Sequence, residues 1–162
     1  MAPTILDRIV RTKREEIETL LTRREELERA LSRAPAPRDL AGALLGEAEV
    51  AVMAEIKRRS PGAGAIRPEL DAPRLARAYE EAGAAAVSVL TDAGYFGGGI
   101  GDLASARPMT SCPLFRKDFI LDAVQLVEAR AAGADGTLLI VSILTDAQLR
   151  DLLAEADAVG LA

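Results

Sequence analysis

The feature that most constrains the fold is a repeated unit of an apolar run, a polar loop, a helical stretch and a glycine. The apolar runs lie at residues 50–57, 84–90, 113–115 and 137–143. Continuous rather than alternating apolarity is typical of parallel strands that are buried on both faces. Glycine follows three of the helical stretches, where it supplies the left-handed conformation that ends a helix: Gly83, Gly133 and Gly160. The pattern predicts about four successive βα units in an α/β fold with a parallel sheet.

The helix starts are also marked. Asp71 precedes Pro73 and an apolar-periodic stretch. Two further segments have the spacing of a capping box, in which a side chain at the helix start and one three residues later bond each other's backbone: Asp122 with Gln125, and Thr145 with Gln148. We therefore expect helices to begin at these three points.

A charged amphipathic helix precedes the repeats. Thr4 and Asp7 have capping-box spacing. One stripe follows the helical period: Leu6, Ile9, Val10, Lys13, Ile17, Leu20 and Leu21. We expect one domain over residues 1–162, with an extra helix at 1–31, a linker and short helix at 32–48, and four βα units at 49–160. A solvated coiled-coil arm is the alternative interpretation of the first helix.

Composition excludes several classes of function. Lys and Arg number 20 against 25 Asp and Glu, a net charge of -5, which argues against a general nucleic-acid binder. The sequence contains no histidine, so His-based zinc sites and Ser-His or Cys-His catalysis are excluded. Acid–base chemistry must then use Asp, Glu or Lys. Cys112 is the sole cysteine, which excludes an intrachain disulfide and predicts a small packing residue.

The N-terminus shows no basic stretch followed by an apolar run, so we expect no secretory signal. No apolar run is long enough to cross a bilayer, so we expect no membrane association. The sequence predicts a cytoplasmic protein.

Functional groups of parallel α/β folds lie at the carboxyl ends of the strands. Glu55 and Lys57 stand two apart at the end of the first run, so they point to one face of the strand. Such a pair could bind an anion or move a proton, or it could be a structural ion pair. Lys117 shares a strand face with Phe115 and Phe119, and partial desolvation there would lower the lysine pKa toward the range useful for proton transfer.

Two loops are weaker candidates. Residues 58–64 are cationic and rich in turn formers, so this loop could close over an anionic substrate or be a solvated turn. The glycines at 97–99 could form a phosphate nest or a mobile loop. Phe96 beside them suits stacking on a ring, with a local core anchor as the alternative. The fourth run carries no ionisable group and would contribute shape.

These motifs together resemble those of the indole-3-glycerol phosphate synthase family. Residues 54–61, Ala-Glu-Ile-Lys-Arg-Arg-Ser-Pro, are similar to the family's first-strand signature, and residues 90–98 resemble its second-strand loop. Residues 114–120, Leu-Phe-Arg-Lys-Asp-Phe-Ile, with 125–135 look like its third unit, and residues 138–140 look like its fourth strand. The opening helix resembles the extra helix that the family places before its barrel.

The resemblance implies a TIM (β/α)₈ barrel and a ring closure that needs no metal or organic cofactor. The small phosphorylated substrate would be 1-(2-carboxyphenylamino)-1-deoxyribulose 5-phosphate, which loses carbon dioxide and water to give indole-3-glycerol phosphate in tryptophan biosynthesis. By matched position, Lys117 would be the general acid, Lys57 would contact the substrate carboxylate, and Glu55 would set the charge of Lys57. Five further positions match substrate-binding residues: Ser60 and Pro61 in a mobile loop, and Phe96, Phe119 and Leu138 around the aromatic ring.

A complete barrel needs about 250 residues, whereas this chain has 162. Gly160 predicts a fifth strand at the last two residues, so we expect an incomplete barrel. By the resemblance, a second catalytic carboxylate and the phosphate-binding loops would follow Ala162. The partner would then be a missing C-terminal half, in a longer product or in another chain. The alternative is a catalytically silent half-barrel that self-associates through exposed edges. A related barrel such as phosphoribosylanthranilate isomerase fits the Arg-Lys-Asp-Phe segment less well.

Overall fold

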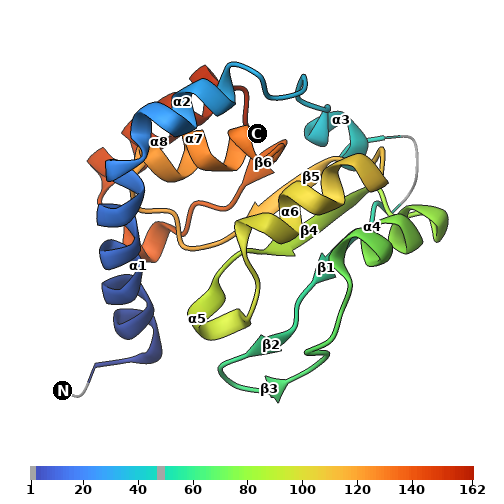
Figure 1. Ribbon diagram of the computed structural model, residues 1–162, viewed down its shortest axis with the longest axis horizontal. Helices are drawn as coiled ribbons and strands as arrows, with labels where there is room; N and C mark the ends of the chain where they lie inside the picture. The colour runs from blue at the N-terminus through green and yellow to red at the C-terminus, as the bar shows by residue number, and fades with distance from the viewer. Residues whose placement is uncertain (1–2, 47–49) are drawn as a thin grey trace.

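A parallel four-stranded sheet lies at the centre of the computed structural model, which describes residues 3–46 and 50–162 (Figure 1). In spatial order the strands are β1 (Met53–Ile56), β4 (Ala86–Leu90), β5 (Leu114–Lys117) and β6 (Gly136–Thr137). All neighbours pair in parallel, so their carboxyl ends meet at one edge of the sheet. The predicted α/β repeat is confirmed. The predicted boundary at residues 48 and 49 lies outside the described residues.

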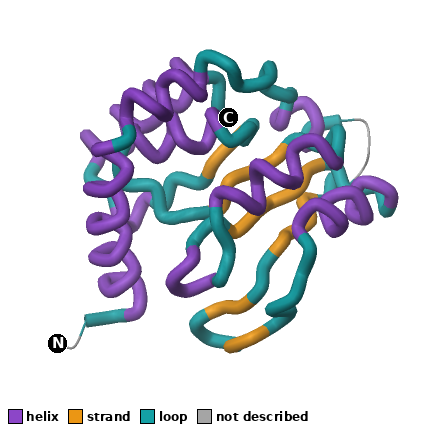
Figure 2. Tube along the Cα trace, viewed as in Figure 1, coloured by secondary structure: helices purple, strands orange, loops and turns teal. Residues whose placement is uncertain are grey.

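Helices alternate with these strands, as the tube trace shows (Figure 2). The longer ones are α4 (Ala72–Glu81), α6 (Ile100–Ala106), α7 (Ala123–Ala131) and α8 (Asp146–Val159), and the shorter ones are α3 (Leu40–Leu44), α5 (Ala93–Phe96) and the 3₁₀ turns η1 (Arg107–Met109) and η2 (Val141–Ile143). The predicted helix starts are confirmed, because Asp71 caps α4 and both capping boxes are present at α7 and α8. The three predicted glycines have positive φ at the ends of α4, α7 and α8.

The N-terminal segment forms two helices rather than the single one expected. These are α1 (Ile5–Thr22) and α2 (Arg24–Leu31), and Arg23 between them leaves the helical conformation with φ -106° and ψ 11°. The bend lets α2 pack against α7 (Figure 1). The solvated-arm interpretation is wrong, because Ile9 and Ile17 are buried.

The fourth apolar run is a much shorter strand than predicted. β6 ends at Thr137, and η2 occupies part of the expected strand at 137–143. The run is apolar for other reasons: Leu139 and Leu144 pack against the main core, while Leu138 and Ile140 line a cavity described below. The backbone of Ala162 bonds both Asp135 and Thr137, so residues 161–162 run beside β6, but they do not form the strand that the sequence predicted.

The two faces of the sheet are covered unequally. In residues 114–120 the even positions are buried and the odd positions are half-buried. The even face meets the helices and carries the main core, which includes Val87, Val89 and Leu114 together with Leu103 and Leu126 of the covering helices. The odd face of β5 therefore presents Lys117 on the less covered side of the sheet.

A buried carboxylate fixes the linker at 32–39 to the amino end of the sheet. Asp135 accepts hydrogen bonds from the backbone of Arg38 (2.7 Å), the guanidinium of Arg107 (2.5 Å) and the backbone of Leu114 (2.8 Å). Arg107 also donates to the carbonyls of Ala36 and Gly133. Residues at this end of such sheets serve stability rather than chemistry.

Among the described residues, no helix combines the length and the apolar character that crossing a membrane requires. The cytoplasmic location stays a prediction.

Candidate active site

Three charged side chains meet at the carboxyl end of the sheet. Glu55 lies on β1, Lys57 follows it after β1, and Lys117 ends β5. The Oε1 atom of Glu55 is 2.6 Å from the Nζ atom of Lys57, and its Oε2 atom is 2.6 Å from the Nζ atom of Lys117. One carboxylate thus bridges two ammonium groups, which leaves the group with a net positive charge.

Glu55 is held in its charged form. Burial alone would raise the pKa of this carboxyl, but hydrogen bonds from Lys117 and Lys57 outweigh burial and lower the pKa below its usual value. The carboxylate is therefore ionised at neutral pH. An ionised Glu55 keeps the two lysines at one place on the sheet despite their mutual repulsion.

Lys117 was expected to be partly desolvated among aromatic rings, and it is half-buried. Its side chain is 43% exposed, and its ammonium contacts a carboxylate rather than a ring. Phe119 does share its face, as predicted. The environment of Lys117 is thus an ion pair at the rim of an apolar cavity.

The charged group forms one side of a cavity of about 90 Å³. Apolar side chains make most of the wall, and the complete lining is Glu55, Lys57, Leu90, Phe96, Lys117, Asp118, Phe119, Leu138 and Ile140. The structure therefore brings together six of the eight residues predicted from the sequence. A cavity with an apolar wall and a cationic side suits a flat ring that carries an anionic group.

Two aromatic rings shape the cavity. The centroids of Phe96 and Phe119 are 6.1 Å apart, and the ring planes are inclined by 36°. This separation is within the range of favourable aromatic pairs. Phe96 comes from α5, after β4, and Phe119 follows β5, so two neighbouring βα loops supply one pair of rings.

Ser60 and Pro61 do not line this cavity. They belong to a hairpin of β2 (Arg59–Ser60) and β3 (Gly64–Ala65), where the Ser60 hydroxyl accepts from the backbone of Ala63 at 3.2 Å. The base of the hairpin is anchored to its neighbours. Arg58 forms an ion pair with Asp102 on α6, and Arg59 donates to two carbonyls of α5.

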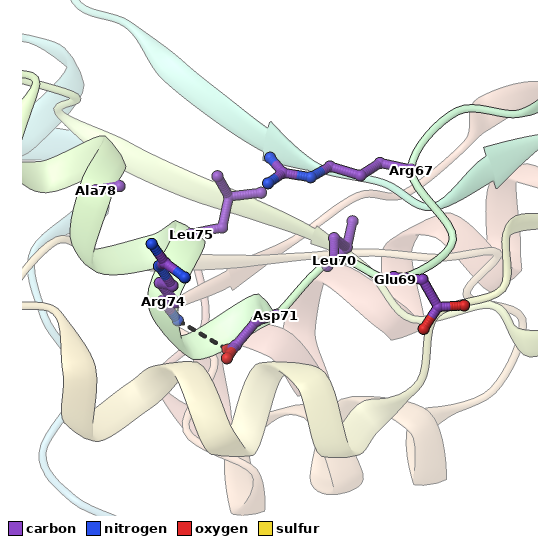
Figure 3. Close-up of a pocket in the computed structure, with 7 residues that line it drawn as sticks. All are labelled: Arg67, Glu69, Leu70, Asp71, Arg74, Leu75 and Ala78. Atoms are coloured by element: carbon purple, nitrogen blue, oxygen red, sulfur yellow. Dashed lines mark hydrogen bonds between the residues drawn. The ribbon is translucent and has the colours of Figure 1, made fainter.

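A larger hollow of about 350 Å³ lies at the start of α4 (Figure 3). Its wall includes Arg67, Glu69, Leu70 and Arg74. Asp71 in this wall is engaged as the helix cap, since it accepts from the backbone of Arg74 (Figure 3). No residue predicted for the site lies there. We place the candidate site in the smaller cavity because the facing charges converge on it.

The chain is similar to known proteins over nearly its whole length. The family model described as Indole-3-glycerol phosphate synthase matches residues 6–162. An indole-3-glycerol phosphate synthase of Dechloromonas aromatica (strain RCB) is 45% identical over 98% of this chain and 62% of its own length. One of Desulforamulus reducens is 42% identical over 97% of this chain and 60% of its own length.

The chain belongs to the indole-3-glycerol phosphate synthase family.

It spans about 60% of the length of these two relatives. The matched region includes the elements that carry Glu55, Lys57 and Lys117, so the family match and the site geometry concern the same part of the chain.

In this member of the indole-3-glycerol phosphate synthase family, the backbone conformation after Phe96 requires glycine at two positions. Gly97 ends α5 in the left-handed conformation, at φ 70°. A Cβ atom on Gly98 would lie 1.9 Å from the carbonyl oxygen of Leu90. The N–H groups of Gly97 and Gly98 already donate to Ala93 and Asp92. These two amides are therefore occupied, which argues against a phosphate nest.

Sequence reasoning missed a buried charged group that joins α1 to two βα loops. Lys13, Asp92 and Asp118 are all buried and lie in contact. A signal existed, because Lys13 occupies the apolar stripe of the first helix. Among residues 3–46 and 50–162, no three Asp, Glu or Cys side chains are grouped so that they could hold a metal ion.

Proposed function

We propose that this chain supplies the first part of an indole-3-glycerol phosphate synthase and carries its general acid. The observation that carries the proposal is the bridge of Glu55 between Lys57 and Lys117 at the rim of an aromatic-lined cavity. The substrate would be 1-(2-carboxyphenylamino)-1-deoxyribulose 5-phosphate. Its benzoate ring matches the apolar wall, and its carboxylate matches the positive charge.

In the proposed reaction, Lys117 protonates the ribulose carbonyl oxygen. The carbonyl carbon then accepts electrons from the ring carbon that bears the carboxylate, and a carbon–carbon bond forms. Loss of carbon dioxide and then of water restores the aromatic system and gives the indole. An ammonium at the cavity rim is suited to this step, since it can reach both solvent and a bound carbonyl.

Lys57 and Glu55 have supporting roles in this proposal. The Lys57 ammonium would bind the substrate carboxylate until carbon dioxide leaves and would assist later proton transfers. Glu55 fixes both lysines through its two oxygens. The substrate carboxylate would compete with Glu55 for the Lys57 ammonium. Substrate binding and the ion pairs among Glu55, Lys57 and Lys117 would therefore affect each other.

The described cavity would hold only the aromatic part of the substrate. Its volume of about 90 Å³ is well below the roughly 300–1,000 Å³ of small-molecule sites. We propose that further strands complete a (β/α)₈ barrel and add a phosphate site and a second carboxylate. Residues 1–162 alone would then have negligible synthase activity, and turnover comparable to that of a complete barrel would contradict this.

The proposal can be tested in a chimera that joins this chain to the C-terminal part of the Dechloromonas aromatica relative. We expect the chimera to form indole-3-glycerol phosphate from the substrate, followed by indole fluorescence. Lys117→Met should reduce kcat by about 10²–10⁴-fold, the usual contribution of a general acid.

Arg77→Met is the matched control, because Arg77 is exposed on α4 and pairs with the equally exposed Glu81. It removes one exposed cation that does not line the cavity and should leave kcat within a factor of about two, as expected for an exposed pair. A folded but inactive chimera, or a Lys117→Met chimera with undiminished kcat, would contradict the proposed function.

Self-association of a silent half-barrel is the second candidate. Exposed apolar side chains next to β1 favour it, since Val50 is 76% exposed and Val52 is 54% exposed.

A further inference from the structure

One ammonium on the N-terminal helix contacts the carboxylates of two neighbouring βα loops. The Nζ atom of Lys13 lies 3.1 Å from Oδ2 of Asp92 and 3.0 Å from Oδ1 of Asp118. All three side chains are almost completely buried, with at most 3% of each exposed. Lys13 also pairs with Glu16, one turn along α1. Of the three, Asp118 also lines the cavity, whereas Lys13 and Asp92 do not.

Each carboxylate in turn holds the backbone of one ring of the cavity. Oδ1 of Asp92 accepts from the N–H groups of Tyr95 (2.6 Å) and Phe96 (3.3 Å). Oδ1 of Asp118 accepts from the N–H group of Phe119 at 2.8 Å. Lys13 thus contacts the two carboxylates that bind the backbone N–H groups of Phe96 and Phe119. Lys13 does not line the cavity itself.

We propose that Lys13 is a positioning residue that sets the spacing of the Phe96–Phe119 pair, and with it the width of the aromatic part of the site. That these two rings contact the substrate rests on the proposed function. The spacing itself does not, because it follows from the contacts between α1 and the two loops.

A second set of contacts fixes the same two loops. Oδ2 of Asp118 accepts from the Thr91 hydroxyl (2.6 Å) and from Arg116 (3.0 Å). Because Arg116 and Asp118 flank Lys117 in the chain, both neighbours of the proposed general acid are held by these buried contacts. On α1, the Thr12 hydroxyl lies 3.1 Å from the hydroxyl of Tyr95. Two consecutive residues of α1 therefore contact the α5 region.

The charge of Lys13 does more than hold α1 against the rest of the molecule. Burial alone would lower the pKa of this lysine, but Asp118, Glu16 and Asp92 raise it above its usual value, so the ammonium stays charged. A buried charged group carries a large desolvation cost, and apolar side chains of similar volume often hold elements together as well or better. Ile9 and Ile17 already provide such apolar contacts one turn away on either side. What the ammonium adds is a defined distance to two carboxylates.

The test uses residues 1–162 and two-dimensional amide NMR. In Lys13→Met the amide resonances of Phe96 and Phe119 should both move, while that of Leu114 at the other end of β5 should not. The Kd for 2-aminobenzoate, which represents the aromatic part of the proposed substrate, should rise at least about fivefold, a modest loss for a misplaced contact. Lys13→Arg should restore most of both values because it keeps a cation between the carboxylates.

Ile17→Ala is the control for simple loosening of α1. Ile17 is buried on the same stripe but belongs to a separate apolar cluster with Leu27, Val124 and Val127. It should lower the stability without moving the amide resonances of Phe96 and Phe119. If Lys13→Met does not fold, Lys13→Gln gives the same comparison, because its amide still donates to a carboxylate.

Unchanged Phe96 and Phe119 resonances in the Lys13 variants, or equal movement in Ile17→Ala, would overturn the proposal. The amide measurement needs no ligand, so it decides the role of Lys13 independently. If the amides move as expected but the wild-type chain does not bind 2-aminobenzoate, the positioning role holds and the proposed function is weakened.

Discussion

Asp118 keeps its negative charge although its side chain is almost wholly buried. Burial alone would raise the pKa of this carboxyl. The charges of Arg116 and Lys13 and the Thr91 hydroxyl oppose burial and lower the pKa from 3.8 to about 2. Because the pKa of the folded state is depressed, the ionised form contributes stability above pH 4, and that contribution is lost as the pH falls from about 4 to about 2.

This linkage predicts a pH-dependent cost for Asp118→Asn. Above pH 5 the variant should be less stable than the wild type by roughly 2 kcal/mol, since each pKa unit corresponds to about 1.4 kcal/mol. The difference should shrink as the pH falls toward 2, because the wild-type carboxyl becomes protonated as the pH passes through its folded-state pKa of about 2. Urea unfolding of both proteins across this range measures it. A difference that stays constant between pH 6 and pH 2 would contradict the linkage.

At this scale the sequence predicts contacts along one strand better than contacts between distant segments. The shared face of Glu55 and Lys57 follows from the two-residue period of a strand, and the place of Lys117 follows from its position after an apolar run. Lys13 also stood out, since it lies in line with Ile9 and Ile17. Its partners were not predictable, because Asp92 and Asp118 come close only after the loops, helices and strands have packed.

Among the elements, the loop from β4 to α6, which includes α5, depends on one close backbone approach. Gly98 passes so near the carbonyl of Leu90 that a side chain cannot fit without moving the loop. The same loop carries Phe96, and Asp92 at its start binds the backbone of Gly98. The shape of this loop and the position of one cavity ring therefore depend on each other.

Gly98→Ala should be destabilising by about 1–3 kcal/mol or more, the usual cost of overpacking a backbone contact. It should also weaken binding of 2-aminobenzoate, because the loop that carries Phe96 must shift. Gly94→Ala is the matched control in α5, where an added Cβ atom meets nothing within 4 Å. Denaturant unfolding and ligand titration of both variants give the comparison. Equal stability of the two variants would contradict the role of Gly98.

Element boundaries were predicted well where side chains cap a helix and poorly where apolarity alone was the signal. Thr145 and Gln148 mark the start of α8 through local bonds that the sequence displays. Leu138, Leu139 and Ile140 are apolar because they line the cavity or meet the core, and no local signal distinguishes that from a strand. The bend at Arg23 was missed for a similar reason, since the packing of α2 on α7 causes it.

At the scale of the whole molecule, the sheet has an open side. Within residues 3–46 and 50–162, β1 pairs with β4 along one edge, and no other strand pairs with its second edge. Exposed edges and nearby apolar side chains favour pairing with another chain. Val52 stands next to that edge and is 54% exposed.

Residues 1–162 should therefore associate with themselves in a concentration-dependent way when tested alone. Val52→Lys should reduce the association, because a lysine beside an edge strand disfavours strand pairing. Leu153→Lys on α8 is the control, since it removes an equally exposed apolar side chain far from β1. Sedimentation velocity of the three proteins measures the effect. A chain that remains monomeric, or equal effects of the two lysines, would contradict an edge-mediated association.

The pairing of α1 with the βα loops also has a consequence for the order of assembly. Thr12 and Tyr95 touch across 83 positions of sequence, and Asp118 is synthesised later still. Contacts between such distant segments form late, because the intervening chain must first be made and closed. Until then the ammonium of Lys13 remains hydrated in the middle of the apolar stripe of α1. Burying that stripe against a wrong surface would leave the charge unpaired, which is costly. The same lysine that spaces the two rings in the finished molecule thus disfavours burial of the first helix against a wrong surface while the rest of the chain is being synthesised.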